Sequence, residues 1–191
     1  MKIVILDRNG TLNEHREDFV KSDIEWMPLP GALEAVARLN HAGWHVVIAS
    51  NQSGLGRGLF DVASLNAMHA KMHKMLAAVG GRIEAVFYCP HSPDENCDCR
   101  KPKPGLFIQI GERFGVDLAH IPVAGDSLRD LQAGAAAGCE THLLLTGMGA
   151  ARRGAPLPPE YPPNTRVHED LSAFVDFLLE REEKAALRLA V

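Results

Sequence analysis

This chain has neither a long apolar run nor a large net charge, two features that would each indicate a class of function. No apolar run approaches the ~20 residues needed to cross a bilayer, and the net charge is only −4 over 191 residues. The first absence argues against a membrane-spanning protein, and the second argues against a nucleic-acid or anionic-membrane partner. There is no internal repeat, no low-complexity segment and no obvious self-complementary apolar face. We therefore expect a single domain, residues 1–191, that acts as a monomer.

A secretory signal peptide is not expected, because Met1 and Lys2 lead directly into an apolar run at residues 3–6. We therefore expect a cytoplasmic protein, and thiols stay reduced in the cytoplasm. The four cysteines of the chain then need an explanation other than disulfide bonds.

Short apolar runs alternate with helical patterns along the chain. The runs at 3–6, 45–49, 83–88, 121–124 and 141–145 are typical of buried strands. Helices are expected at 31–43, 61–79, after 105, at 131–137 and at about 169–189. This alternation favours an α/β fold with a Rossmann-like, doubly wound parallel sheet. The Pro- and Gly-rich residues 149–163 are expected to form an irregular tether to the last helix.

The first apolar run, Ile3 to Leu6, ends at Asp7 and is followed closely by Gly10. Ligands of open α/β sheets bind outside the carboxyl ends of the strands, so Asp7 is expected at the mouth of a cleft. A carboxylate placed there can bind a metal ion, act as a nucleophile or serve as a base. An aspartate that merely caps a turn is the alternative.

Polar side chains also follow three further predicted strands. They are Ser50 and Asn51 after the second, Arg100 and Lys101 after the third, and Asp126 and Asp130 after the fourth. Parallel strands share one carboxyl edge, so these groups are expected to converge with Asp7. Carboxylates suit Mg²⁺, and small polar groups and a lysine can hold a phosphoryl group. The sequence therefore predicts a magnesium and phosphate site.

Three cysteines and a histidine form a second cluster, with the spacing Cys89-x-His91 and Cys97-x-Cys99. This set suits a tetrahedral, closed and therefore structural Zn²⁺ site. A disulfide, or four unrelated polar residues, are the alternatives. The fourth cysteine, Cys139, lies well outside the cluster and is expected to be a small core residue.

With these residues in place, the sequence resembles the haloacid dehalogenase-like phosphotransferases over roughly residues 1–146. ILDRNGT, IASNQ, Lys101 and AGDSLRD match the four motifs of that family. The resemblance implies that Asp7 attacks phosphorus and becomes an aspartyl phosphate, and that Ser50 and Lys101 contact the phosphoryl group. It also implies that Mg²⁺ binds Asp7, Asp126 and the backbone carbonyl of Asn9, with Asp130 as a supporting carboxylate.

Asn9 departs from the family pattern, in which an aspartate at this position is the general acid and base. Asparagine can do neither, and such assistance is worth roughly 10²–10⁴-fold. Either the asparagine was introduced to trap substrate, or the natural protein is a weak enzyme or a phosphate-ligand binder. We favour the first because every other motif is intact.

The cysteine-rich loop, 89–99, narrows the resemblance to the branch that contains histidinol-phosphate and heptose-1,7-bisphosphate phosphatases, which lack a large cap domain. SNQSGLGRGLF is more similar to the heptose-bisphosphate enzymes, while the short CPHSPDENCDC loop keeps histidinol phosphate as an alternative. The resemblance implies that a phosphorylated sugar is bound by the following residues: His15, Arg16, Glu17, Asp18, Ser50, Asn51, Gln52, Ser53, Arg57, Arg100 and Lys101. A solvated loop for 15–18, and a surface position for Arg100, are the alternatives. His69 and His73 have helical spacing but no accompanying glutamate, so both are expected at the surface.

Overall fold

The centre of the protein is a six-stranded parallel sheet with the strand order β3-β2-β1-β4-β5-β6. The computed structural model describes residues 1–190. β1 lies between β2 and β4, so that Ile5 pairs with Val47 on one side and Val123 on the other. The strands are β1 Lys2–Leu6, β2 Trp44–Asn51, β3 Ala85–Cys89, β4 Pro122–Gly125, β5 Glu140–Leu144 and β6 Arg166–His168.

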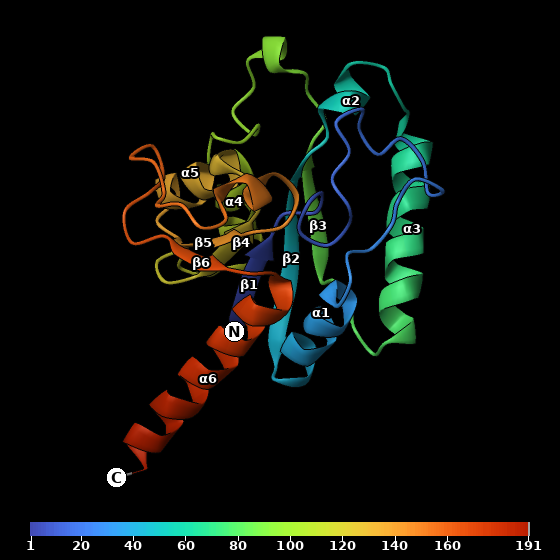
Figure 1. The fold of residues 1–191 in the computed structure, drawn as a ribbon. Helices are drawn as coiled ribbons and strands as arrows, with labels where there is room; N and C mark the ends of the chain where they lie inside the picture. Colours follow the sequence, from blue (N-terminus) through green and yellow to red (C-terminus); the bar gives the residue numbers. More distant parts are fainter. Residues whose placement is uncertain (191) are drawn as a thin grey trace.

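Helices cover both faces of this sheet (Figure 1). Successive residues of β1 point to opposite faces: Val4 and Leu6 belong to one buried cluster, and Ile3 and Ile5 to the other. The first cluster is completed by α1 (Ala32–His41), α3 (Val62–Ala78) and α6 (Leu171–Leu189), and the second by α4 (Gly105–Phe114) and α5 (Leu128–Ala136). Because β1 is buried on both faces, its carboxyl end is a rigid support for Asp7.

Side-chain caps fix the starts of α3, α5 and α6. Asp61 accepts a hydrogen bond from the backbone N–H of Ser64 and begins α3. At α5, Ser127 and Asp130 form a capping box, in which Asp130 accepts from the backbone N–H and the hydroxyl of Ser127. This cap holds Asp130 at the carboxyl edge of the sheet, beside the end of β4.

The five predicted strands and the predicted helices are present, and the predicted fold class is confirmed. Met68 and Met72 of α3 are fully buried core residues. Sequence analysis did not predict β6 or the short helix α2, Ser53–Gly56. The segment expected to be irregular from 149 onward begins with a 3₁₀ helix, Gly147–Arg152, and His69, expected at the surface, is half-buried and contacts Arg8.

The ends of the chain lie away from the carboxyl edge of the sheet. The buried side chains of α6, Leu171, Phe174, Val175 and Leu178, lie in its first half. Figure 1 shows the rest of this helix projecting beyond the body of the protein. Within residues 1–190, no helix combines the length and the apolar character that a membrane crossing requires.

Candidate active site

Three carboxylates converge at the carboxyl edge of the sheet, where β1 lies between β2 and β4. Asp7 follows β1, Asp126 follows β4 and Asp130 lies in the first turn of α5. Oxygen atoms of all three lie within 4.8 Å of one another. The crossover connections lead to opposite sides at this point of the strand order, which is where ligands of doubly wound sheets bind. The predicted convergence of these aspartates is therefore confirmed.

Lys101 lies between two of these carboxylates. Its Nζ donates to Asp7 Oδ1 at 2.8 Å and to the Ala49 carbonyl at 2.7 Å, and it pairs with Asp130 Oδ1 at 2.7 Å. Burial alone would lower the pKa of Lys101, but the charges of Asp130 and Asp7 raise it. Lys101 therefore stays a cation, although its side chain is only 2% exposed.

Asp126 is fixed from the opposite side by the segment that follows β5. The backbone N–H of Met148 donates to Asp126 Oδ2 at 2.8 Å, and the Thr146 hydroxyl donates to the Gly10 carbonyl at 2.6 Å. Gly10 and Gly147 flank the carboxylate so closely that a Cβ at either position would overlap with Asp126 Oδ2. No pattern in the sequence predicts this role of the segment, because a backbone N–H can come from any residue type except proline.

The electrostatics of this cluster favour a divalent cation. Burial and the charge of Asp130 raise the pKa of Asp7, and burial with the charges of Asp7 and Asp130 raises the pKa of Asp126 well above its usual value. Three carboxylates face a single ammonium group, Lys101. Both oxygens of Asp130 are occupied by Lys101 and Ser127, which leaves Asp7 and Asp126 as the carboxylates that fit Mg²⁺.

The last two residues of β2, Ser50 and Asn51, support this site from within the protein. Ser50 is buried, and its hydroxyl accepts from Gln52 Nε2 at 2.7 Å. The Asn51 side chain accepts from the Lys101 backbone N–H at 3.0 Å and donates to the Lys101 carbonyl at 3.1 Å. Asn51 therefore fixes the backbone of the lysine that contacts Asp7.

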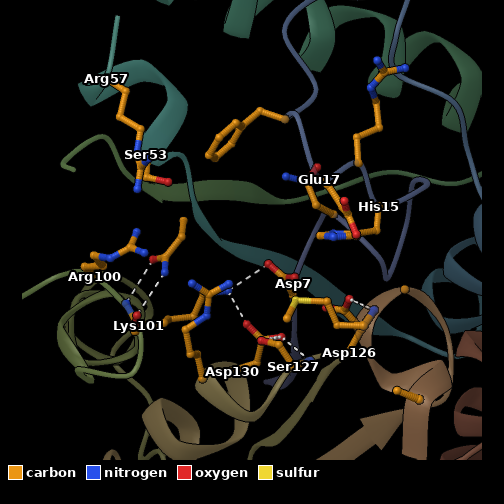
Figure 2. A pocket seen from close by; sticks show the side chains of 18 residues that line it. Asp7, His15, Glu17, Ser53, Arg57, Arg100, Lys101, Asp126, Ser127 and Asp130 are labelled. Atoms are coloured by element: carbon orange, nitrogen blue, oxygen red, sulfur yellow. Dashed lines mark hydrogen bonds and ion pairs between the residues drawn. The ribbon is translucent and has the colours of Figure 1, made fainter. Parts of the chain in front are cut away.

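The carboxylates form the floor of a cleft of about 670 Å³. Its lining includes the expected residues Asn9, His15, Arg16, Glu17, Asn51, Ser53, Arg57, Arg100 and Lys101. Ser50 and Gln52 lie beneath the lining, and Asp18 is turned outward, where it pairs with Arg16 at 3.0 Å. In the view of Figure 2, Arg57 and Arg100 lie on one side of Asp7, and His15 and Glu17 on the other.

Three arginines of the cleft lining, Arg57, Arg100 and Arg129, lie close enough for Arg57 and Arg129 to act on the charge of Arg100, and we call them the arginine wall. Burial lowers the pKa of Arg100, and the charges of Arg129 and Arg57 lower it further. Nη1 of Arg100 is buried and has no hydrogen-bond partner among the described residues. Sequence reasoning missed Arg129, although it lies inside the motif AGDSLRD. The wall is a concentration of positive charge that suits an anionic group of a ligand.

The Asn9 side chain is held by three N–H donors. Its Oδ1 accepts from Nε and Nη2 of Arg8 at 3.2 and 3.0 Å, and from Asn13 Nδ2 at 3.0 Å. Asn9 also lines the cleft. An amide at this position can bind but cannot donate or accept the proton that acid–base chemistry requires.

The cysteine-rich loop gathers its four predicted ligands into one cluster. The Sγ of Cys89 lies 3.4 Å from Nδ1 of His91 and 3.5 Å from the Sγ of Cys97, and the Sγ of Cys99 lies 3.3 and 3.6 Å from the same two atoms. Donors around a tetrahedral zinc ion lie roughly 3.3–3.8 Å apart, whereas a disulfide requires about 2.05 Å. All four cysteines are free, so the cluster fits a metal ion, and Cys139 is buried elsewhere as expected.

Comparison with known proteins identifies the class to which this fold and site belong. The family model described as "HAD-hyrolase-like" matches residues 98–174, which include Lys101, Asp126 and Asp130. The sheet order, the carboxylate cluster and this match define a hydrolase of the haloacid dehalogenase (HAD) class.

Curated relatives narrow the class further. The D-glycero-beta-D-manno-heptose-1,7-bisphosphate 7-phosphatase of Bordetella bronchiseptica is 54% identical over 180 residues, which are 94% of this chain and 99% of the relative. The Pseudomonas aeruginosa enzyme of the same name is 47% identical over 178 residues, 93% and 98% of the two chains. This chain belongs to the D-glycero-β-D-manno-heptose-1,7-bisphosphate 7-phosphatase family.

A solved structure agrees with this assignment. The D,D-heptose 1,7-bisphosphate phosphatase from B. bronchiseptica, crystallised in complex with magnesium and phosphate, superposes with a TM-score of 0.89 at 54% identity. It covers 95% of this chain and 99% of its own. The family resemblance inferred from the sequence is therefore confirmed.

Proposed function

We propose that this chain is a magnesium-dependent phosphatase fold that removes the 7-phosphate of D-glycero-β-D-manno-heptose 1,7-bisphosphate, with turnover suppressed by Asn9. The observation that carries the proposal is the contact between Lys101 and Asp7 beside Asp126, at the floor of a cleft with an arginine wall. The near-full-length relatives of the same family support the choice of substrate.

In the proposed reaction, a carboxylate oxygen of Asp7 attacks phosphorus. The bond between phosphorus and the sugar oxygen breaks, and the sugar leaves as an alkoxide that must be protonated. Water then attacks the phosphorus of the aspartyl phosphate, gives up a proton, and releases inorganic phosphate and free Asp7. An aspartic acid at position 9 would protonate the alkoxide and then take this proton from the water, whereas Asn9 can do neither. Lys101, held by Asp130, and the Ser50 hydroxyl, which lies beneath the lining of the cleft, are proposed to bind the oxygens of the phosphoryl group.

The bound metal would offset the negative charge that the phosphoryl group brings to the carboxylates. Asp7, Asp126 and the backbone carbonyl of Asn9 are the proposed ligands. Asp126 keeps the required orientation because Met148 and the flanking glycines fix it.

The arginine wall is the proposed site of the second phosphate, the 1-phosphate of the sugar. Arg57, Arg100 and Arg129 lie in one cleft with the carboxylates, and Arg100 keeps a buried N–H without a partner. A guanidinium suits phosphate because its planar N–H groups can bind two oxygens at once. His15, Arg16, Glu17 and Ser53 are proposed to contact the sugar between the two phosphates.

We also propose that Zn²⁺ binds Cys89, His91, Cys97 and Cys99 as a structural ion, because all four positions of a tetrahedron are filled by protein ligands. The loop lies directly before Arg100 and Lys101 in the chain. Fixing Cys99 therefore restrains these two cations of the cleft.

The test is a comparison of this chain with the Asn9→Asp variant, assayed with magnesium on heptose 1,7-bisphosphate and on histidinol phosphate. We expect the variant to hydrolyse the heptose substrate at least about 100-fold faster than this chain. Mass spectrometry must confirm that Asn9 is intact, because an Asn-Gly pair deamidates readily. Equal rates for both proteins would refute the assignment of position 9, and a preference for histidinol phosphate would replace the substrate.

Asn9 itself favours one other function, a protein that binds the phosphorylated sugar without hydrolysing it. Calorimetric titration separates the two. Tight binding by this chain together with an inactive Asn9→Asp variant would support the binding protein.

A further inference from the structure

Arg8 is a charged residue buried in the protein core, with 0% of its surface exposed. Its guanidinium extends from the end of β1 toward α3, where Nη2 approaches Met68 Sδ at 3.9 Å. Nε and Nη2 both donate to Asn9 Oδ1, and Nη1 lies 3.1 Å from His69 Nε2. Within residues 1–190, no side-chain carboxylate forms a salt bridge with Arg8. A buried guanidinium of this kind ordinarily has an anionic partner.

The contact with Arg8 fixes the protonation of His69. A guanidinium has only donors, so His69 Nε2 must accept the hydrogen bond and the ring proton must lie on Nδ1. Burial lowers the pKa of His69 to about 4, with a further contribution from the charge of Arg8. His69 is therefore a neutral hydrogen-bond acceptor at pH 7.

We propose that Arg8 and His69 are positioning residues for the side chain at position 9. His69 fixes the Arg8 guanidinium, and Arg8 in turn holds Oδ1 of residue 9 at a defined place beside the cleft. The inference rests on the proposed function, in which position 9 carries the acid and base of the reaction. In this proposal, α3 helps to position the reacting groups although its residues do not line the cleft.

The geometry at position 9 suits a carboxylate better than an amide. Arg8 directs two N–H groups, and Asn13 a third, at one oxygen of the side chain. Hydrogen bonds to an ionised acceptor are roughly twice as strong as those between neutral groups. An aspartate at position 9 would also give the Arg8 guanidinium an anionic partner. The alternative is that Arg8 only balances the charge of Asp7, to which it is adjacent in the chain, and then His69 has no part in placing residue 9.

The experiment changes the acceptor on α3 in the active background, the Asn9→Asp variant. His69→Leu removes the acceptor, and His69→Gln retains one. His73→Leu is the matched control, because His73 lies one helical turn further along α3 and is exposed. We expect His69→Leu to lower kcat about 10- to 100-fold with KM changed less than about twofold, since misplacement of a reacting group affects turnover. His69→Gln should recover most of this loss, and His73→Leu should have no effect.

A second readout does not depend on activity. In this chain, the side-chain amide of Asn9 gives its own ¹⁵N–¹H resonances, and His69→Leu should shift them while His73→Leu should not. Unchanged resonances in a folded His69→Leu protein would overturn the inference, as would unchanged kcat or equal losses in the leucine and glutamine variants. An inactive Asn9→Asp protein would instead overturn the proposed function, and the amide resonances would then decide the inference alone.

Discussion

Gly147 offers a direct test of how the segment after β5 holds the proposed metal ligand Asp126. Gly147 has a φ of 50°, and a Cβ at this position would overlap with Asp126 Oδ2 and lie 2.6 Å from Cα of Gly10. Neither neighbour can move freely, because Asp126 is held by the Met148 N–H and Gly10 is backbone. The Gly147→Ala substitution must therefore displace Asp126, the segment after β5, or both.

The expected loss of folding stability in Gly147→Ala has two parts. A left-handed backbone conformation costs a non-glycine residue roughly 1–2 kcal/mol, and forcing a side chain into filled space costs roughly 1–3 kcal/mol more. Gly154 provides a matched control, because its φ is 73° but no atom lies within 4 Å of a Cβ placed there. Gly154→Ala should carry only the first part, so the difference between the two variants measures the overlap at Asp126.

The assay is urea unfolding of both variants with and without MgCl₂. Gly147→Ala should be about 1–3 kcal/mol less stable than Gly154→Ala. Its magnesium affinity should fall about 10- to 100-fold, as is typical when the support of a metal ligand is disturbed. If Gly147→Ala bound magnesium as tightly as the Gly154→Ala control, the segment after β5 would not be what orients Asp126.

Three further predictions concern other parts of the molecule. Cys97→Ser should abolish zinc binding and lower the free energy of unfolding by on the order of several kcal/mol, whereas the control Cys139→Ser should keep the zinc. Metal analysis and thermal unfolding measure both effects. Equal zinc contents in the two variants would contradict the zinc site. Burial lowers the pKa of His142 to about 4, so the contribution of His142 to the free energy of unfolding should be complete above about pH 6.5 and fall by about 3 kcal/mol as the pH drops toward 4. His142→Gln should flatten this pH dependence, which urea unfolding across the range measures. An unchanged slope in the variant would argue against the assignment to His142. Arg100→Ala should weaken binding of heptose 1,7-bisphosphate to this chain by roughly 10- to 100-fold but change binding of heptose 7-phosphate little. Calorimetry measures both affinities. Equal losses for the two ligands would show that Arg100 does not bind the second phosphate.

The sequence was informative where residue type and position along a strand decide the structure. Asp7 directly follows a buried apolar strand, and Asp126 follows another, so the parallel topology required them to meet. The cysteine and histidine spacing fixed the loop cluster equally well, since all four ligands come from one short segment. These predictions depended only on local pattern and on the shared carboxyl edge of the sheet.

Sequence reasoning failed where the environment, and not the residue type, determines the role. Arg8 belongs to a residue type that is mostly exposed, and only the packing of α3 against the end of β1 reveals that it is buried beside the half-buried His69. β6 contains only three residues, two of them exposed, so it lacks the apolar run that marks a strand. Met148 binds Asp126 through its backbone N–H, and no residue type in the sequence marks such a donor.

The place of the cysteine-rich loop in the chain has a consequence for the cell. Cys99 is followed immediately by Arg100 and Lys101, so an ion that takes no part in bond breaking would govern the alignment of two groups that bind substrate. With Zn²⁺ bound as proposed, protein made under zinc starvation would lose the alignment of Arg100 and Lys101 even with magnesium abundant. Binding of the phosphorylated sugar would be tied to the supply of a trace nutrient.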